Sequence, residues 1–181
     1  KGSSANEDVL DPSGDFQART RVHEYGGGAA MVYSGVAYFS NWKDQRVYKV
    51  DVAKGSQPIP ITPAEKEIRF ADPCVDPKRQ RIIYVQEDHT TGAKEPANRI
   101  VAVPMDGVSE PTVLISGADF YDSPRISPCG TKIAWVQWNH PNMPWDDTAV
   151  CVGSLDQAGH VSNIKVIAGV PLSENESVTY P

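Results

Sequence analysis

The feature that most constrains the fold is an internal repeat. Residues 71–87 (ADPCVDPKRQRIIYVQE) match residues 122–138 (DSPRISPCGTKIAWVQW), with a constant shift of about fifty positions. Prolines, turn residues and apolar residues keep step in both copies. The matched pairs are Pro73 and Pro124, Val75 and Ile126, Pro77 and Pro128, Ile82 and Ile133, Tyr84 and Trp135, Val85 and Val136, and Gln86 and Gln137. Such a period indicates one supersecondary unit that stacks on its copies to bury its apolar faces.

Each unit contains four short β-prone runs separated by turns rich in Pro, Gly, Asp and Ser. Residues 46–51 alternate between apolar and polar side chains, as in a strand with one packed face. No segment shows the apolar stripe of an amphipathic helix. The remaining predicted strands are residues 29–33, 36–40 and 58–62 in a looser first unit, 99–103 and 112–115 in the second, and 149–153 and 165–167 in the third.

The sequence therefore predicts an all-β fold of about three four-stranded β-propeller blades, that is, a partial propeller, since propellers close with roughly four to eight blades. We expect a flexible N-terminal segment over residues 1–19 and the partial propeller over residues 20–181. The expected blades cover about residues 20–65, 66–117 and 118–170, with a further blade beginning at 171–181. A β-sandwich with strands about 8 to 12 residues apart is the competing fold, and the repeat favours the propeller.

Composition argues against several classes of function. The formal net charge of −6 disfavours nucleic-acid binding, which depends on cationic side chains. No apolar run approaches the roughly 20 residues that span a bilayer, and the N-terminus lacks the features of a signal peptide. Three cysteines cannot all pair, which fits a reducing compartment, so we expect a cytoplasmic protein. No spacing of ligands matches a zinc or calcium site, and we expect neither metal nor cofactor.

Three strings carry a family resemblance: residues 20–29 (TRVHEYGGGA), residues 39–48 (FSNWKDQRVY) and residues 119–146 (DFYDSPRISPCGTKIAWVQWNHPNMPWD). From Arg19 onward the chain resembles the N-terminal propeller of prolyl oligopeptidase-family serine peptidases, in the branch of acylaminoacyl peptidases and dipeptidyl-peptidase-like enzymes. The resemblance implies a parent with a C-terminal α/β-hydrolase domain that carries the catalytic Ser, Asp and His. The G-x-S-x-G elbow of that domain does not occur in this sequence. Residues 127–130 read SPCG where the family usually has SPDG, so a turn-stabilising aspartate is lost.

The string HEYGGG supplies most of the candidate site. His23, Glu24 and Tyr25 are predicted to lie on an innermost strand, where they would line the channel and contact a peptide. The alternative is a buried hydrogen-bond cluster at a blade junction, where the glycines permit close packing. Arg21 is predicted to pair with Glu24 or with a carboxylate of the substrate.

Arg125 completes the candidate site. It follows the proline of its inner-strand tract and is predicted to point into the channel, where its planar fork would hold an acidic group or an acylated terminus. A salt link between blades is the alternative role.

Together these residues predict a non-catalytic, substrate-gating propeller portion of a serine peptidase that acts on short or N-acylated peptides. Its partners would be the hydrolase domain and short peptides, with no nucleic acid and no membrane. The alternative is a stand-alone, lectin-like binding protein completed by formation of a homo-oligomer. A scaffold without a ligand is the third interpretation.

Overall fold

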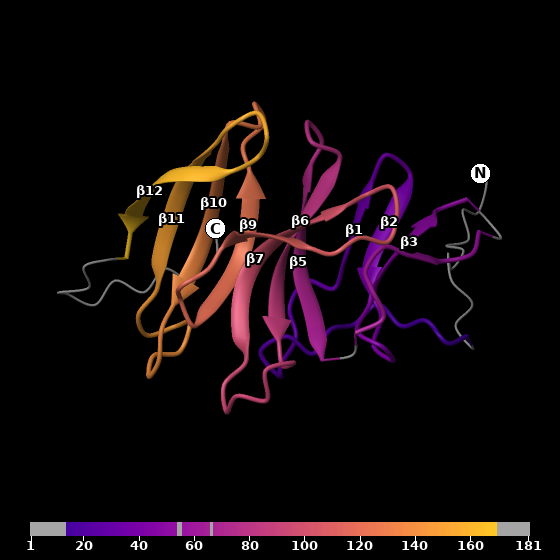
Figure 1. The fold of residues 1–181 in the computed structure, drawn as a ribbon, viewed down its shortest axis with the longest axis horizontal. Coiled ribbons are helices and arrows are strands. Elements are labelled where there is room, and N and C mark those ends of the chain that lie inside the picture. Colours follow the sequence, from indigo (N-terminus) through magenta and orange to yellow (C-terminus); the bar gives the residue numbers. More distant parts are fainter. Residues whose placement is uncertain (1–13, 54–55, 66, 170–181) are drawn as a thin grey trace, which may run out of the picture.

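Three four-stranded antiparallel sheets make up the described part of the chain (Figure 1). The computed structural model describes residues 14–53, 56–65 and 67–169, and this part contains no helix, hence none that could span a membrane. The first sheet contains β1 (Ala30–Tyr33), β2 (Val36–Ser40), β3 (Val47–Asp51) and β4 (Ile59–Pro60). The second contains β5 (Ile68–Asp76), β6 (Arg81–Asp88), β7 (Ala97–Pro104) and β8 (Thr112–Ile115). The third contains β9 (Phe120–Ile126), β10 (Lys132–Trp138), β11 (Ala149–Leu155) and β12 (Val161–Ala168). The predicted all-β fold of four-stranded units is confirmed.

The two matched segments of the sequence form equivalent hairpins. Val75 of β5 lies opposite Ile82 of β6, and Ile126 of β9 lies opposite Ile133 of β10. In each sheet the strands follow one another in chain order, so β1, β5 and β9 are the first strands of their sheets. The two matched segments therefore occupy equivalent positions in the second and third sheets.

A bulge interrupts each of these hairpins at the same point. Asp72 and Ser123 have left-handed backbone angles, with φ of 53° and 50°, and the pairing register shifts there in both sheets. A proline follows each of these residues, Pro73 and Pro124. Proline has no N–H to donate to the ladder, and a bulge leaves one residue unpaired, so the two features occur together.

The second sheet buries both of its faces. Ile82 and Tyr84 of β6 pack toward the first sheet, and the alternate residues Ile83 and Val85 pack toward the third. This alternation follows from the two-residue period of a strand. The core between the first and second sheets also includes Tyr38, Val47, Ile61, Phe70, Val101 and Val103. The core between the second and third sheets also includes Val22, Ile100, Tyr121, Ile133, Trp135 and Cys151.

Contacts between sheets centre on the first strands: β5 contacts both β1 and β9. Figure 1 shows the sheets side by side in chain order, with β1–β3 at the right and β9–β12 at the left. The first strands thus form the shared side of the three sheets, as in the axial lining of a propeller.

The residues just before the first sheet also contact it. Ala18 forms a β-bridge with Asn41. The ring of Phe16 packs on Phe39 and Tyr48, with centroids 6.2 and 5.1 Å away. Of the predicted flexible segment, residues 1–13 lie outside the described residues, as does the predicted start of a further blade at 171–181.

Candidate functional site

The HEYGGG string was predicted on an innermost strand, but this prediction is wrong: the string forms a loop before β1 that lies against the second sheet. The Gly28 N–H donates to Oδ1 of Asp72 at 2.6 Å, and the Asp72 N–H donates to the Gly28 carbonyl at 2.7 Å. A Cβ atom on Gly28 would lie 2.8 Å from Oδ1 of Asp72, closer than real Cβ contacts. Gly28 therefore has a close-packing role that a larger residue could not fill.

Two successive residues of this loop have backbone conformations that L-residues rarely adopt. The φ angles of His23 and Glu24 are 55° and 64°. The His23 N–H donates to Oε2 of Glu87 at 2.7 Å, and the Glu24 N–H donates to the Arg21 carbonyl at 3.0 Å. Such conformations persist only where the surroundings fix them, and they gather at functional sites.

The side chain of His23 sits among aromatic rings. The ring centroids of Tyr25, Phe120 and Trp138 lie 5.7, 5.5 and 5.5 Å from its own. Burial lowers the pKa of His23, against the smaller opposing effects of the Glu87 and Asp122 charges. The imidazole is therefore neutral at physiological pH. Its Nε2 atom is buried and has no hydrogen-bond partner among the described residues.

These rings form one wall of a cavity of about 260 Å³, which we call the aromatic pocket. It is lined by His23, Tyr25, Phe120, Trp138 and residues 140–144. The rings of Phe120 and Trp138 stack with centroids 5.3 Å apart and planes 13° apart. The strings HEYGGG and HPNMP, far apart in the sequence, thus meet in one pocket.

An arginine that sequence reasoning missed organises the acids beside this pocket. Nη1 of Arg69 donates to the carboxylate of Glu24 at 2.7 Å and to that of Glu87 at 2.9 Å. It also donates to the Arg21 carbonyl at 3.0 Å. The hydrogen bond from Arg69 lowers the pKa of Glu24, and the Arg69 charge adds to this effect. Arg69 could have been found as the residue at the start of β5 that corresponds to Phe120 at the start of β9.

Arg21 does not form the predicted direct pair with Glu24, whose partner is Arg69. The guanidinium of Arg21 lies over the ring of Trp42, 4.3 Å from its centroid, and Arg19 lies over the same ring at 4.0 Å. Stacking on an aromatic face is a favourable position for guanidinium groups.

The acids around Arg69 are also the metal-capable group of the described residues. Ligand atoms of Glu24, Glu87 and His89 lie within 4.8 Å of one another. Nε2 of His89 is 2.6 Å from Oε1 of Glu87. Because the guanidinium of Arg69 already bonds both carboxylates, a metal ion would have to displace a cation. We assign no metal to this group.

Arg125 lies on β9 beside two carboxyl groups of the first strands, Asp72 and Asp122. Burial raises the pKa of Asp72 to about 7, aided by its hydrogen bond to Asp122 and opposed by the Gly28 N–H and the Arg125 charge. Among the described residues, Arg125 forms no ion pair within 4 Å, and its Nη1 donates to the Pro124 carbonyl at 2.8 Å. Asp72 and Asp122 were missed, although the repeat places both beside its inner-strand prolines.

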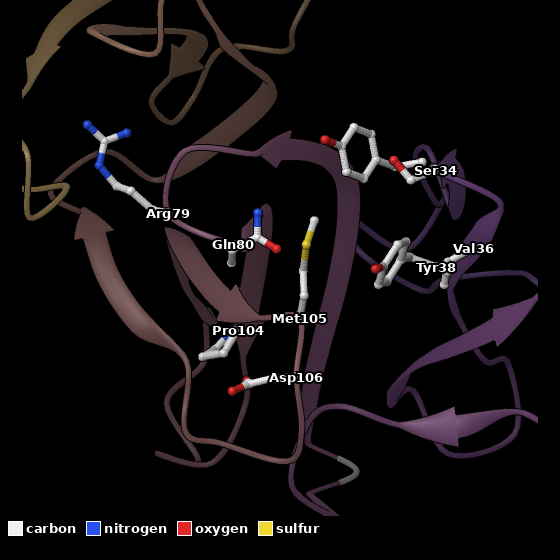
Figure 2. A pocket seen from close by; sticks show the side chains of 9 residues that line it. Ser34, Val36, Tyr38, Arg79, Gln80, Pro104, Met105 and Asp106 are labelled. Atoms are coloured by element: carbon white, nitrogen blue, oxygen red, sulfur yellow. The ribbon is translucent and has the colours of Figure 1, made fainter.

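A larger cavity of about 690 Å³ lies between the first and second sheets (Figure 2). Tyr33, Val36, Tyr38 and Met105 contribute to its wall. Figure 2 shows the guanidinium of Arg79 directed away from the other lining side chains; it bonds Asp76 and carbonyls of the third sheet. This cavity therefore presents no convergent set of charged groups, and we do not assign it a ligand.

No protein-family model and no curated protein matches the chain. Solved structures do match. A puromycin-hydrolysing peptidase from Mycobacterium tuberculosis is 36% identical with a TM-score of 0.76, over 87% of this chain and 26% of that one. A puromycin hydrolase is 27% identical with a TM-score of 0.82, over 92% of this chain and 28% of that one. A putative TolB from Agrobacterium tumefaciens, at 22% identity and a TM-score of 0.53, shares the fold. The chain thus spans about a quarter of the length of the peptidases it matches.

Proposed function

Because the chain shares fold and sequence with the propeller region of prolyl oligopeptidase-family peptidases, we propose that it is the non-catalytic, substrate-gating part of a serine peptidase. The peptidase would act on short or N-acylated peptides. The observation that carries this proposal is the 36% identity to a puromycin-hydrolysing peptidase over 87% of the chain. The sequence contains no G-x-S-x-G elbow, so in this proposal bond cleavage would fall to a hydrolase domain outside this chain.

The gating role would depend on the first strands. Asp72, Asp122 and Arg125 lie together there on β5 and β9. Charged groups that line a narrow opening select ligands by charge, and the opening itself excludes folded proteins by size. The two acids and the arginine would thus contact the polar ends of short peptides on their way to the catalytic domain.

We also propose a cytoplasmic location. The three cysteines are unpaired, and Cys129 is exposed. An exposed free thiol is more compatible with a reducing compartment than with an oxidising one.

The proposal is tested with the purified chain and acylated and dipeptidyl chromogenic substrates. We expect no turnover and no labelling by a serine-directed inhibitor. We also expect saturable binding of short peptides in calorimetry, and none of a folded protein used as control. Turnover that the inhibitor abolishes would overturn the non-catalytic role, and binding of the folded protein as strongly as of peptides would overturn the gating role.

One observation favours the stand-alone binding protein as a second candidate. The outermost strand β12 exposes Ile164, Val166 and Ile167, and exposed edge strands tend to pair with other chains. A discrete dimer in sedimentation that also binds a glycan array would support this candidate over the gating role.

A further inference from the structure

His23, which lines the aromatic pocket, has a buried polar atom without a hydrogen-bond partner in the described part of the chain, its Nε2. Buried polar atoms in folded proteins are nearly always hydrogen-bonded, so each exception requires an explanation. The neutral imidazole has one donor and one acceptor nitrogen. A ligand that enters the pocket with a polar atom at its tip would satisfy Nε2.

The loop holds this imidazole in place. The backbone of His23 is fixed by its bond to Glu87, and Arg69 ties Glu87 to Glu24 and to the Arg21 carbonyl. The left-handed angles of His23 and Glu24 are thereby maintained. A side chain held before the ligand arrives adds affinity, because little freedom remains to be lost on binding.

The rest of the pocket favours a flat apolar group. The stacked rings of Phe120 and Trp138 meet the edge of His140, whose centroid is 4.9 Å from that of Phe120. Residues 141–144 contribute two prolines and Met143, which is 40% exposed. The cavity of about 260 Å³ has room for one aromatic side chain. Aromatic groups bind aromatic walls through offset-stacked and edge-to-face contacts.

The electrostatics disfavour a cation as the occupant. The charges of Glu87 and Asp122 act on His23. Glu87, together with Glu24, is already bonded to Arg69, and Asp122 is hydrogen-bonded to Asp72. Glu95 lies 3.8 Å from Nε2 of His140, and its side chain is 59% exposed. A cationic ligand would gain contact with the rings, but the buried acids around the pocket already have partners.

We propose that the aromatic pocket is a subsite for a phenol-bearing side chain of a peptide, with the ring on Phe120 and Trp138 and the hydroxyl on Nε2 of His23. A hydroxyl fits because it can donate or accept, so it can bond either tautomer of the imidazole. This inference rests on the proposed function, since it names the class of peptide that the gate selects.

The test is an NMR titration of the chain, following the indole N–H of Trp138 and the ring of His23. The probes are N-acetyl-tyrosinamide, N-acetyl-phenylalaninamide and N-acetyl-leucinamide, and ligands this small bind in the millimolar range. We expect tyrosinamide to bind about threefold to tenfold more tightly than phenylalaninamide, the value of one net hydrogen bond. Leucinamide is expected to shift these signals least.

Two variants separate the hydrogen bond from the aromatic contacts. His23→Phe keeps a ring but removes Nε2, so the preference for tyrosinamide over phenylalaninamide should disappear. Met143→Trp lies at the exposed rim, where folding is not at risk, and should block all three probes. His160→Phe is the matched control, because His160 is an exposed histidine whose partner Asp156 lies in the same turn.

Equal affinities for the three amides, or an unchanged preference in His23→Phe, would overturn the subsite. Tighter binding of benzylamine than of tyrosinamide would overturn it too, in favour of a cation site. These results do not depend on turnover of chromogenic substrates, so failure of the subsite is distinguishable from failure of the gating role.

Discussion

A Cβ on Gly28 would approach Oδ1 of Asp72 to 2.8 Å, whereas nothing lies within 4 Å of a Cβ built on Gly107. We therefore expect Gly28→Ala to lower the free energy of unfolding by about 1–3 kcal/mol, the usual cost of overpacking. Gly107→Ala should leave it nearly unchanged. Urea denaturation of both variants provides the measurement. Equal stabilities would show that the loop moves away from β5 without cost.

Cys129 is predicted to react with alkylating agents near neutral pH. Its Sγ lies 3.3 Å from Oγ of Ser127 and 2.9 Å from Oγ1 of Thr131, and these hydrogen bonds lower its pKa to about 7. Since the thiolate is the nucleophile, alkylation by iodoacetamide should rise with pH through a midpoint near this value. Ser127→Ala combined with Thr131→Val should move the midpoint upward, as measured by mass spectrometry of quenched samples.

The other two thiols serve as internal controls in that experiment. Burial raises the pKa values of Cys74 and Cys151, so both should stay unmodified at pH 7. Faster labelling of either than of Cys129 would contradict the assignment.

The sequence alone predicted only part of the candidate site around His23. The string around His23 and Glu24 was specific enough to mark these residues as a candidate site, but it was expected on a strand and forms a loop. Its partners Arg69 and Glu87 were not found. The Glu24–Arg69 and His23–Glu87 contacts join residues 45 and 64 positions apart. Such pairs depend on how the sheets are rotated against one another, and no local pattern of residues encodes that rotation.

At the scale of elements, strands were predicted best where alternation was strict. Residues 46–51 and 36–40 were expected, and β3 and β2 occupy nearly the same positions. The fourth strand was expected over 58–62 but contains only Ile59–Pro60, since Pro58 and Pro60 cannot donate to the ladder. The last strand was expected only over residues 165–167, because Ser162 and Asn163 interrupt the apolar pattern. β12 nevertheless covers Val161–Ala168, and Asn163 within it has a left-handed φ of 50°.

The second and third sheets are also joined by a polar clamp centred on a fully buried carboxylate. Asp76 accepts from Nη1 of Arg79 and Nε of Arg81, each at 2.9 Å. The same guanidinium groups donate to the Gly130 carbonyl at 3.1 Å and the Gly159 carbonyl at 3.0 Å. Asp76→Ala leaves two largely buried guanidinium groups without their carboxylate, and we expect a loss of about 3–5 kcal/mol in the free energy of unfolding, measured by urea denaturation.

The control for this variant is an exposed ion pair. Lys43 and Asp15 lie 2.7 Å apart with most of both side chains in solvent. Asp15→Ala should not change stability measurably, because exposed pairs contribute little. An equally small effect of Asp76→Ala would mean that apolar packing alone holds the two sheets together.

The paired carboxyl groups of Asp72 on β5 and Asp122 on β9 should make the stability of the chain depend on pH. The pKa of Asp72 is raised to about 7, so between about pH 4 and pH 7 the folded chain keeps a proton that the unfolded chain has released. The stabilisation that comes from this retained proton is complete below about pH 4 and is lost as the pH rises to about 7. Asp72→Asn should flatten the decline and make the chain more stable than wild type at pH 8.

His23 acts in the opposite direction, because burial lowers its pKa and favours its neutral form. Its contribution is lost as the pH falls below its ordinary titration range. Comparing the urea denaturation of wild type and Asp72→Asn at several pH values isolates the contribution of Asp72 to stability, because both chains contain His23. Parallel pH profiles would contradict the role given to the pair.

At the scale of the whole molecule, the repeat in the sequence predicted that the sheets stack on one another, but not which loops come together to form the aromatic pocket. The second sheet buries both faces between its neighbours, as copies that hide one another's apolar faces should. The aromatic pocket combines the loop before β1 with the β9–β10 hairpin and the segment after β10, and skips the second sheet's own strands. A sequence period gives the order of units but not which loops converge at the end of the stack.

The outer edge of the third sheet predicts how the molecules associate. β12 exposes Ile164, Val166 and Ile167 at 52%, 45% and 63%, and Lys165 is the one charged residue among them. Charges on an edge strand oppose pairing with other chains. We therefore expect Ile167→Lys to reduce concentration-dependent association in sedimentation velocity, and Lys165→Val to increase it.

Val113→Lys supplies the control, since Val113 is 48% exposed on β8, the outermost strand of the second sheet. β8 contains only four residues, and a short edge offers few N–H and C=O groups to a partner. The substitution there should change association much less than Ile167→Lys. Equal effects at the two positions would mean that association follows net charge, and that β12 offers no edge to a second chain.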